Sequence, residues 1–214
     1  MKLKKNLWVF GDSFSVPFEK MIDDHPYIPY KGYCPKIFSI LLSEKFDFRL
    51  RDCARGGSSN YDIFHTFIKN IDNILEDDII IFGWTQTIRF RVANKNNDFY
   101  DVIIAVVDKM IEFHGVPCNS LIDISDNRAK SSVYFDELYD FIKIIEKSKP
   151  NCKILHWTWV EPYFKDRYEK RFYDLLIPYK KYKTVKEETN ENVNDFHYGE
   201  LGHYELYEEL SKFL

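Results

Sequence analysis

The segment 78–82, Asp-Ile-Ile-Ile-Phe, most constrains what this chain can fold into. Its β-branched apolar residues favour a strand, and the run is bounded by charge on one side and by Gly83 on the other. A strand with no polar face is typical of a parallel sheet that helices cover on both sides. The segment therefore predicts a buried central strand.

The rest of the chain alternates in the same way between short apolar runs and segments of helical period. The runs predict further strands at 6–10, 48–53, 153–159 and 181–185. Helical spacing predicts helices at 35–46, 102–113, 133–147 and 201–213, and Ser59 with Asp62 predicts a capped helix start. Polar stretches predict loops at 115–132 and 186–194. Strands separated by helices imply parallel pairing, so we expect an α/β fold: a three-layer α/β/α sandwich around a mostly parallel sheet of about five strands.

Size and composition exclude several classes of protein. The 214 residues suit one sizeable core and contain no evident linker, so we expect residues 1–214 to form a single domain. A net charge of −4 and a pI near 5.9 give no support for nucleic-acid binding. No apolar stretch approaches the roughly 18 residues of a membrane helix, and the run at 7–10 is too short for a signal peptide, which predicts a cytoplasmic protein. The scattered cysteines predict no structural zinc site.

Polar residues and glycines follow the first three predicted strands, at 11–13, 56–58 and 83–86, and the segment 156–159 ends the fourth. Because the carboxyl ends of parallel strands meet at one edge of a sheet, these segments are expected to converge there. A serine at such an edge is a nucleophile when a base, an orienting group and oxyanion donors accompany it, and otherwise it only caps the following turn. The segment 195–197, Asp-Phe-His, offers an acid and a base near the far end of the chain.

Taken together, these motifs resemble the SGNH (GDSL) hydrolase family. That family has a Ser in Gly-Asp-Ser, a Gly after the second strand, an Asn in Gly-x-Asn-Asp after the third, and a late His. The segment 11–15 is similar to the first block, 54–60 to the second, and 195–197 with Gly202 and His203 to the last. The resemblance spans nearly the whole chain in order and spacing. It implies the flavodoxin-like SGNH hydrolase fold and a serine esterase.

Two positions depart from the family pattern. The third block reads Gly-Trp-Thr-Gln, so Thr85 stands at the family's Asn and Gln86 follows it. Loss of one oxyanion donor costs about 10²–10³ in rate, and either side chain is a candidate substitute. The family commonly places its Asp three residues before the His, where this chain has Asn194, whereas Asp195 lies two before. Asp195 is the nearby carboxylate on that side and is our candidate for the orienting acid.

The resemblance implies a mechanism that needs neither a cofactor nor a metal. His197 takes the proton of Ser13, which attacks an ester-linked acyl group of a small molecule or carbohydrate, for example an O-acetyl group, while Asp195 orients the histidine. The expected oxyanion donors are the N–H groups of Ser13 and Gly57 with Thr85 or Gln86. Two alternatives stay open. One is a catalytically eroded binding or structural protein of the same fold, and the other is an acyltransferase that uses the same residues.

Four further residues are candidates for substrate contacts. Arg89 closely follows the third block and would bind an acidic substrate group, unless it belongs to a solvated face. Trp84 and Trp157 would either line a cleft or pack in the core. His156 stands at the end of a predicted strand, on the expected active edge.

Overall fold

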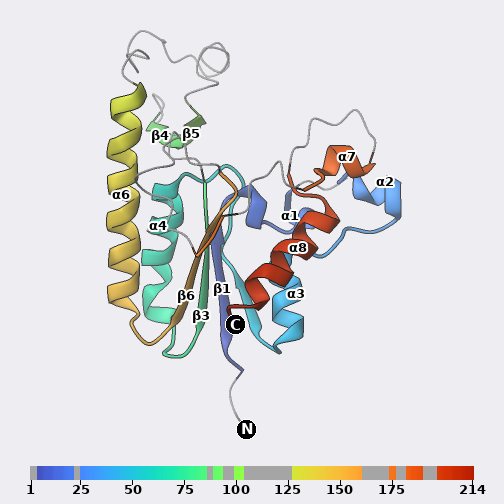
Figure 1. Ribbon diagram of the computed structural model, residues 1–214, viewed down its shortest axis with the longest axis horizontal. Helices are drawn as coiled ribbons and strands as arrows, with labels where there is room; N and C mark the ends of the chain where they lie inside the picture. The colour runs from blue at the N-terminus through green and yellow to red at the C-terminus, as the bar shows by residue number, and fades with distance from the viewer. Residues whose placement is uncertain are drawn as a thin grey trace.

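The computed structural model describes residues 4–21, 25–85, 89–93, 99–103, 127–160, 174–176, 182–189 and 197–214, and for 89–93, 99–103, 127–135 and 176 it describes only the backbone. Its centre is a five-stranded parallel sheet with the strand order β2-β1-β3-β6-β7 (Figure 1). The strands are β1 (Asn6–Gly11), β2 (Arg49–Asp52), β3 (Ile79–Trp84), β6 (Lys153–Thr158) and β7 (Leu175–Leu176). The expected α/β fold with a parallel sheet is confirmed.

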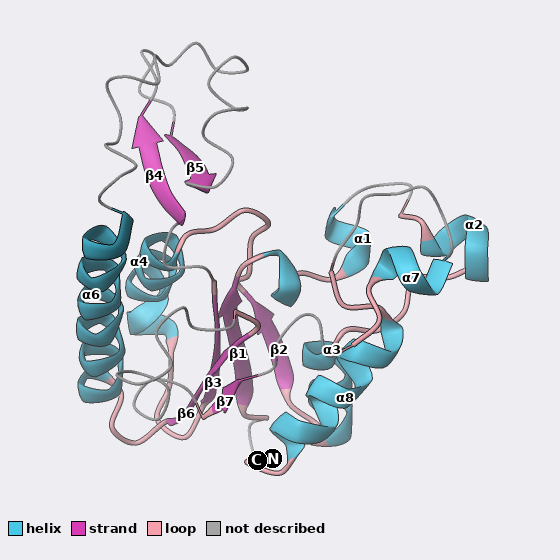
Figure 2. Ribbon diagram, turned by 45° about the horizontal axis from the view of Figure 1, so that its top comes forward, coloured by secondary structure: helices cyan, strands magenta, loops and turns pink. Residues whose placement is uncertain are grey.

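Helices cover both faces of this sheet, as Figures 1 and 2 show from two directions. One face carries α3 (Phe38–Lys45) and α8 (Glu200–Ser211), and the other carries α4 (Asn60–Asn70), continued by the turn η2 (Ile71–Asn73), and α6 (Asn127–Ser148). Alternate strand residues point to the two faces, which is the period of a strand. Leu7 and Val9 therefore pack with α3 and α8, and Trp8 and Phe10 pack with α4 and α6.

A buried carboxylate fixes the register at the amino edge of the sheet. Asp78 is 2% exposed and accepts hydrogen bonds from the side chains of Asn6 and Trp8 and from the backbone N–H of Asn6 and Leu75. Leu7 then pairs with Ile79, and each following residue of β1 pairs with the next residue of β3, up to Gly11 and Gly83. All five strands consequently end at the same edge of the sheet, where the candidate site is expected.

Short helices gather around the start of α8. They are α1 (Phe18–Met21), α2 (Tyr27–Lys31) and α7 (Val185–Thr189). Phe18, Tyr27, Ile37 and Val185 form a small core of their own beneath these helices. Segments from the two ends of the sequence thus meet beside the carboxyl edge of the sheet (Figure 2).

The prediction of a fifth strand at 181–185 is wrong. Thr184 forms only an isolated bridge with Tyr198, and Val185 begins α7. The fifth strand is instead the two-residue β7, which pairs with Trp157 and Thr158 of β6. The helix has a local signal, because Thr184 and Glu187 form a reciprocal capping pair of the Thr-x-x-Glu type.

Two other predicted segments differ from the structure. Within the predicted helix 102–113, Val102 and Ile103 belong to β5 (Phe99–Ile103), which pairs antiparallel with β4 (Arg89–Ala93) in a separate two-stranded sheet. Residues 104–113 lie outside the described part. The predicted loop 115–132 overlaps α6 from Asn127 onward, where the good helix formers Arg128, Ala129 and Lys130 follow. Strand pairing depends on a partner that periodicity within one segment does not reveal.

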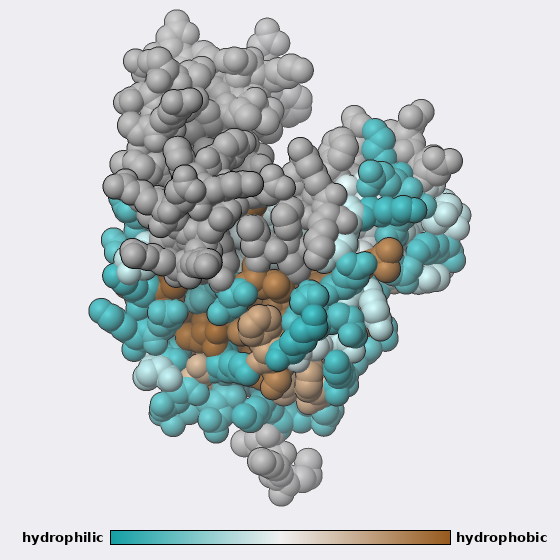
Figure 3. Space-filling view, in the orientation of Figure 1, coloured by the Kyte–Doolittle hydropathy of each residue, from teal (hydrophilic) through white to brown (hydrophobic). Residues whose placement is uncertain are grey.

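The face of the molecule in Figure 3 is mostly hydrophilic over α6 and α8, with an apolar area between them where β6 lies. Among the described helices, none combines the length and the apolar character needed to cross a bilayer.

Candidate functional site

Ser13 stands at the carboxyl edge of the sheet because the chain turns sharply after β1. It begins a short 3₁₀ turn, η1 (Ser13–Ser15), and is half-buried. Asp12 caps this turn by accepting the N–H of Phe14 at 3.0 Å. The turn folds back onto the sheet, and the Ser15 hydroxyl occupies the space that a Cβ at Gly11 or Gly83 would need. This packing role of the two glycines depends on a contact between separate segments, so no local sequence pattern indicates it.

Asp12 also connects the nucleophile turn to the end of β6. Its carboxylate is fully buried and accepts the indole N–H of Trp159 at 3.0 Å. The Trp159 ring stacks on Phe14 with centroids 4.3 Å apart. Ser13 therefore lies between two residues that are each fixed by Trp159.

His197 comes from the far end of the sequence to the same place. Its ring centroid lies 4.8 Å from that of Phe14, the residue after Ser13. Its carbonyl accepts the N–H of Val185 at 2.9 Å, and the N–H of Gly199 donates to the carbonyl of Lys183 at 2.8 Å. The segment 183–185 thus binds the backbone on both sides of the buried Tyr198, and we call this segment the strap.

The loop after β2 reaches the site through backbone bonds. The N–H of Arg55 donates to the carbonyl of Gly11 at 3.1 Å, which continues the pairing of β1 and β2 past their ends. Gly57 is exposed and adopts φ +80°, a conformation that favours glycine. Ser59 and Asp62 form the expected capping box at the start of α4, and this prediction is confirmed.

The side-chain amide of Asn60 binds the backbone of Thr85 in both directions. Its oxygen accepts the Thr85 N–H at 2.9 Å, and its nitrogen donates to the Thr85 carbonyl at 3.1 Å. Thr85, the residue after β3, is thus fixed to the start of α4. Thr85 is 1% exposed, and its hydroxyl is buried without a hydrogen-bond partner among the described residues. Asn60 belongs to the second sequence block, yet its contact with the third block depends on the fold.

Three residues considered for substrate contacts pack in the interior. Trp84 and Trp157 are fully buried, on opposite faces of the sheet. His156 is also buried and accepts the indole N–H of Trp84 at its Nδ1, 3.0 Å away. Burial lowers the pKa of His156 to about 4, so its ring is neutral near pH 7. These side chains offer no open surface to a substrate, and we leave them out of the proposed contacts.

His203 lies in the first turn of α8. It is fully buried among aromatic rings and packs edge-to-face against Phe18 and Tyr198. Burial, and then the charge of His197, lowers the pKa of His203 to about 3. A neutral His203 adds no positive charge beside His197.

Several predicted site residues lie outside the described part of the chain. They are Asp195, its alternative Asn194, Gln86 and the side chain of Arg89, whose backbone belongs to β4. Within the described ranges, no group of three or more His, Cys, Asp or Glu side chains is arranged to hold a metal ion.

Comparison with known proteins identifies the fold. No protein-family model matches the chain, and no curated protein matches it. The structure is similar to that of a carbohydrate esterase, with a TM-score of 0.51 and 13% sequence identity over 99% of this chain and 68% of that one. At this identity the likeness shows a shared fold and no more.

Two other solved structures align more loosely. An acetyl xylan esterase from the rumen bacterium Butyrivibrio proteoclasticus gives a TM-score of 0.43 at 9% identity over 99% of this chain and 54% of that one. A Bacillus subtilis protein gives 0.35 at 12% identity over 98% of this chain and 42% of that one. The chain therefore spans about half the length of these two proteins.

Proposed function

We propose that this protein is a serine hydrolase of the SGNH type that cleaves an ester-linked acyl group, with O-acetyl groups on carbohydrate as the substrate class. The observation that carries the proposal is the contact between His197 and Phe14. A histidine from the end of the chain lies beside the residue that follows Ser13, on the edge where the strands end. Nucleophilic catalysis by serine requires a base within hydrogen-bond reach of the hydroxyl, and this ring contact supports our assignment of His197 as that base.

In the proposed reaction, the Ser13 hydroxyl attacks the acyl carbonyl while His197 takes its proton. His197 then gives this proton to the departing alcohol, and water hydrolyses the acyl-enzyme by the same steps. Asp195 orients His197. The N–H groups of Ser13 and Gly57, with a group from Thr85 or Gln86, hold the oxyanion. The exposed position and positive φ of Gly57 support its part in this proposal.

The carbohydrate part of the proposal is supported only by analogy of fold with the carbohydrate esterase described above. The active site of that protein combines divergent catalytic and non-catalytic binding functions. A fold of this kind accommodates both activities, so the substrate class must be tested directly on this chain.

A fluorophosphonate probe tests the nucleophile, since it forms a covalent bond only with an activated hydroxyl. Wild-type protein is expected to be labelled, whereas Ser13→Ala and His197→Ala lose labelling by about 10⁴-fold or more. Ser43→Ala is the matched control, because the Ser43 hydroxyl donates to Ile40 within α3, away from the site. Absence of wild-type labelling, or equal labelling of Ser13→Ala, overturns the proposal. Acetate release from acetylated oligosaccharides then tests the substrate class.

One observation favours a second candidate, a non-catalytic binding protein of the same fold. The Thr85 hydroxyl, at the position of the family's oxyanion donor, is buried and away from solvent. If Gln86 does not supply a donor either, the site retains two backbone donors and has little catalytic power. Acetylated oligosaccharide that binds in calorimetry and is not hydrolysed supports this candidate.

A further inference from the structure

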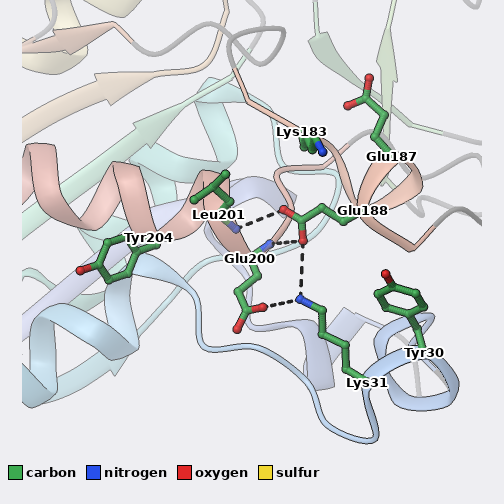
Figure 4. Close-up of a pocket in the computed structure, with 8 residues that line it drawn as sticks. All are labelled: Tyr30, Lys31, Lys183, Glu187, Glu188, Glu200, Leu201 and Tyr204. Carbon is green, nitrogen blue, oxygen red and sulfur yellow. Dashed lines mark hydrogen bonds and ion pairs between the residues drawn. The ribbon is translucent and has the colours of Figure 1, made fainter.

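One carboxylate holds the start of α8, at the point where this helix leaves the His197 segment. Glu188 accepts the N–H of Glu200 at 3.0 Å through Oε2 and the N–H of Leu201 at 3.1 Å through Oε1 (Figure 4). The first N–H groups of a helix have no partner inside the helix. Gly199, at the capping position, has no side chain to accept them, so a carboxylate from α7 does.

Tyr27 adds a third segment to this contact. Its hydroxyl donates to Glu188 Oε2 at 2.6 Å and accepts the N–H of Glu200 at 2.9 Å. Burial, followed by the hydrogen bond to Glu188, raises the pKa of Tyr27 far above its ordinary value, so it remains a donor. Lys31 lies 3.9 Å from Glu188 and forms an ion pair with Glu200. We call these five residues, Tyr27, Lys31, Glu188, Gly199 and Glu200, the Glu188 junction.

Within the junction, the Glu188 side chain is closely fitted and mostly buried. The Glu188 side chain is 11% exposed. A Cβ at Gly199 would clash with its carboxylate, so the contact requires glycine there. A negative charge at a helix N-terminus is favourable, and more so where water screens it little. Glu188 therefore anchors the first residues of α8.

The junction lies next to the proposed base. Only Tyr198 and Gly199 separate His197 from α8. The strap 183–185, which bonds the backbone of His197 and Gly199, continues directly into α7 and thus into Glu188. The strap and the junction together hold the backbone from the His197 carbonyl to the first residues of α8. Phe14 then limits where the imidazole ring lies.

We propose that Glu188 is a positioning residue for His197: by holding the start of α8 it keeps the imidazole within reach of Ser13. This inference rests on the proposed function. Glu188 acts through His197 and does not touch substrate. A merely structural role would lower the melting temperature and leave the reaction rate of the folded protein unchanged.

The rate of fluorophosphonate labelling, measured well below the unfolding temperature, tests this proposal. Glu188→Ala is expected to lower the rate about tenfold to a hundredfold, because displacements near 1 Å have such effects. Glu188→Gln keeps one acceptor oxygen, so its labelling rate is expected to lie between those of wild type and Glu188→Ala. Added formate is expected to restore the labelling rate of Glu188→Ala, because it binds at the position of the missing carboxylate. Glu44→Gln removes an equal charge from the exposed ion pair with Lys36 and is expected to leave the rate unchanged.

A double-mutant cycle separates positioning from general destabilisation. In the His197→Ala background, Glu188→Ala is expected to change the residual rate by less than about twofold, because the group on which it acts is gone. Full additivity of the two losses, or Glu188 variants as reactive as wild type, overturns the inference. Where Glu188→Ala does not fold, Glu188→Gln and Gly199→Ala, which displaces the carboxylate sterically, serve in its place.

A measurement without activity distinguishes failure of this inference from failure of the proposed function. The imidazole resonances of His197 in a ¹H–¹⁵N spectrum are expected to shift in Glu188→Gln and not in Glu44→Gln. Unchanged resonances overturn the positioning role even if Ser13 is reactive. Shifted resonances in a protein that no probe labels support the positioning role while the proposed hydrolase function fails.

Discussion

The side-chain amide of Asn60 pairs with the backbone of Thr85 in both directions, at 2.9 and 3.1 Å. This contact fixes the backbone of Thr85, the position where the resemblance to SGNH hydrolases places an oxyanion donor. Asn60→Ala leaves a buried N–H and a buried carbonyl of Thr85 without this partner, and we expect it to lower the free energy of unfolding by about 1–3 kcal/mol. Urea denaturation measures the change.

A second amide on the same helix provides the control for Asn60. Asn70 donates to the carbonyl of Thr66 within α4 and is only partly buried. Asn70→Ala is expected to cost less, about 0.5–1.5 kcal/mol. If the two substitutions lower the free energy of unfolding equally, the buried Asn60–Thr85 pair contributes no more to stability than the partly buried Asn70–Thr66 bond.

Gly57 and Gly32 adopt nearly the same backbone conformation, φ +80° and +78°, and at each of them a Cβ would meet no other atom within 4 Å. An alanine at either position is expected to cost about 1–2 kcal/mol, because the left-handed conformation disfavours a side chain. Only Gly57→Ala is expected to lower kcat as well, since it disturbs a proposed oxyanion donor, by about tenfold to a hundredfold. Equal kcat values for the two variants would exclude Gly57 from the oxyanion hole.

Trp159 donates to the buried carboxylate of Asp12, and this bond fixes the turn that presents Ser13. Trp159→Phe preserves an aromatic ring against Phe14 and removes the donor. We expect a loss of stability of about 1–3 kcal/mol, as for other hydrogen bonds to charged groups. Because Asp12→Ala removes the acceptor, the two substitutions together are expected to cost less than their sum, and strict additivity would show that the bond contributes nothing.

The orienting acid of His197 is open to a direct comparison. If Asp195 has this role, Asp195→Ala is expected to lower kcat about 10⁴-fold. The imidazole then loses the group that holds it in the correct tautomer and that stabilises its protonated form. Asn194→Ala is then expected to have a small effect. Steady-state hydrolysis of an aryl ester by both variants decides between them, and the reverse ranking would assign the role to Asn194.

Stability is expected to fall with acid because His156 is buried in its neutral form. Its folded pKa is lowered to about 4, below the ordinary 6.5 of the unfolded chain. Between these values the unfolded state binds more protons, so the stabilisation is complete above about pH 6.5 and is lost as the pH falls towards 4, by on the order of 3 kcal/mol. His203, whose pKa is lowered to about 3, acts in the same direction.

Urea denaturation across this pH window tests the effect. His156→Gln retains an acceptor for the Trp84 indole and cannot titrate, so its free energy of unfolding is expected to depend less on pH than that of wild type. An unchanged pH dependence in this variant would show that His156 is not the group responsible.

Local patterns in the sequence predict much of the fold. The apolar run at 78–82 predicts β3, and the alternation of such runs with helical periods predicts the parallel sheet and its two helical layers. Ser59 and Asp62 predict the start of α4. These features depend on burial and capping within one segment, so they are visible without knowledge of its neighbours. The predictions for 102–103 and 181–185 are wrong because strand pairing requires a distant partner.

The sequence by itself determined that the strands end at one edge of a parallel sheet, and with this that Ser13, Gly57 and Thr85 share that edge. Only the tertiary structure decided that His197 contacts Phe14, and that Trp84, Trp157 and His156 are buried in the core. It also decided that Asn60 holds Thr85 and that Glu188 holds the start of α8. The physical reason is the same in each case: periodicity specifies which side of an element is buried, whereas hydrogen bonds and ring contacts between distant segments depend on how the elements pack.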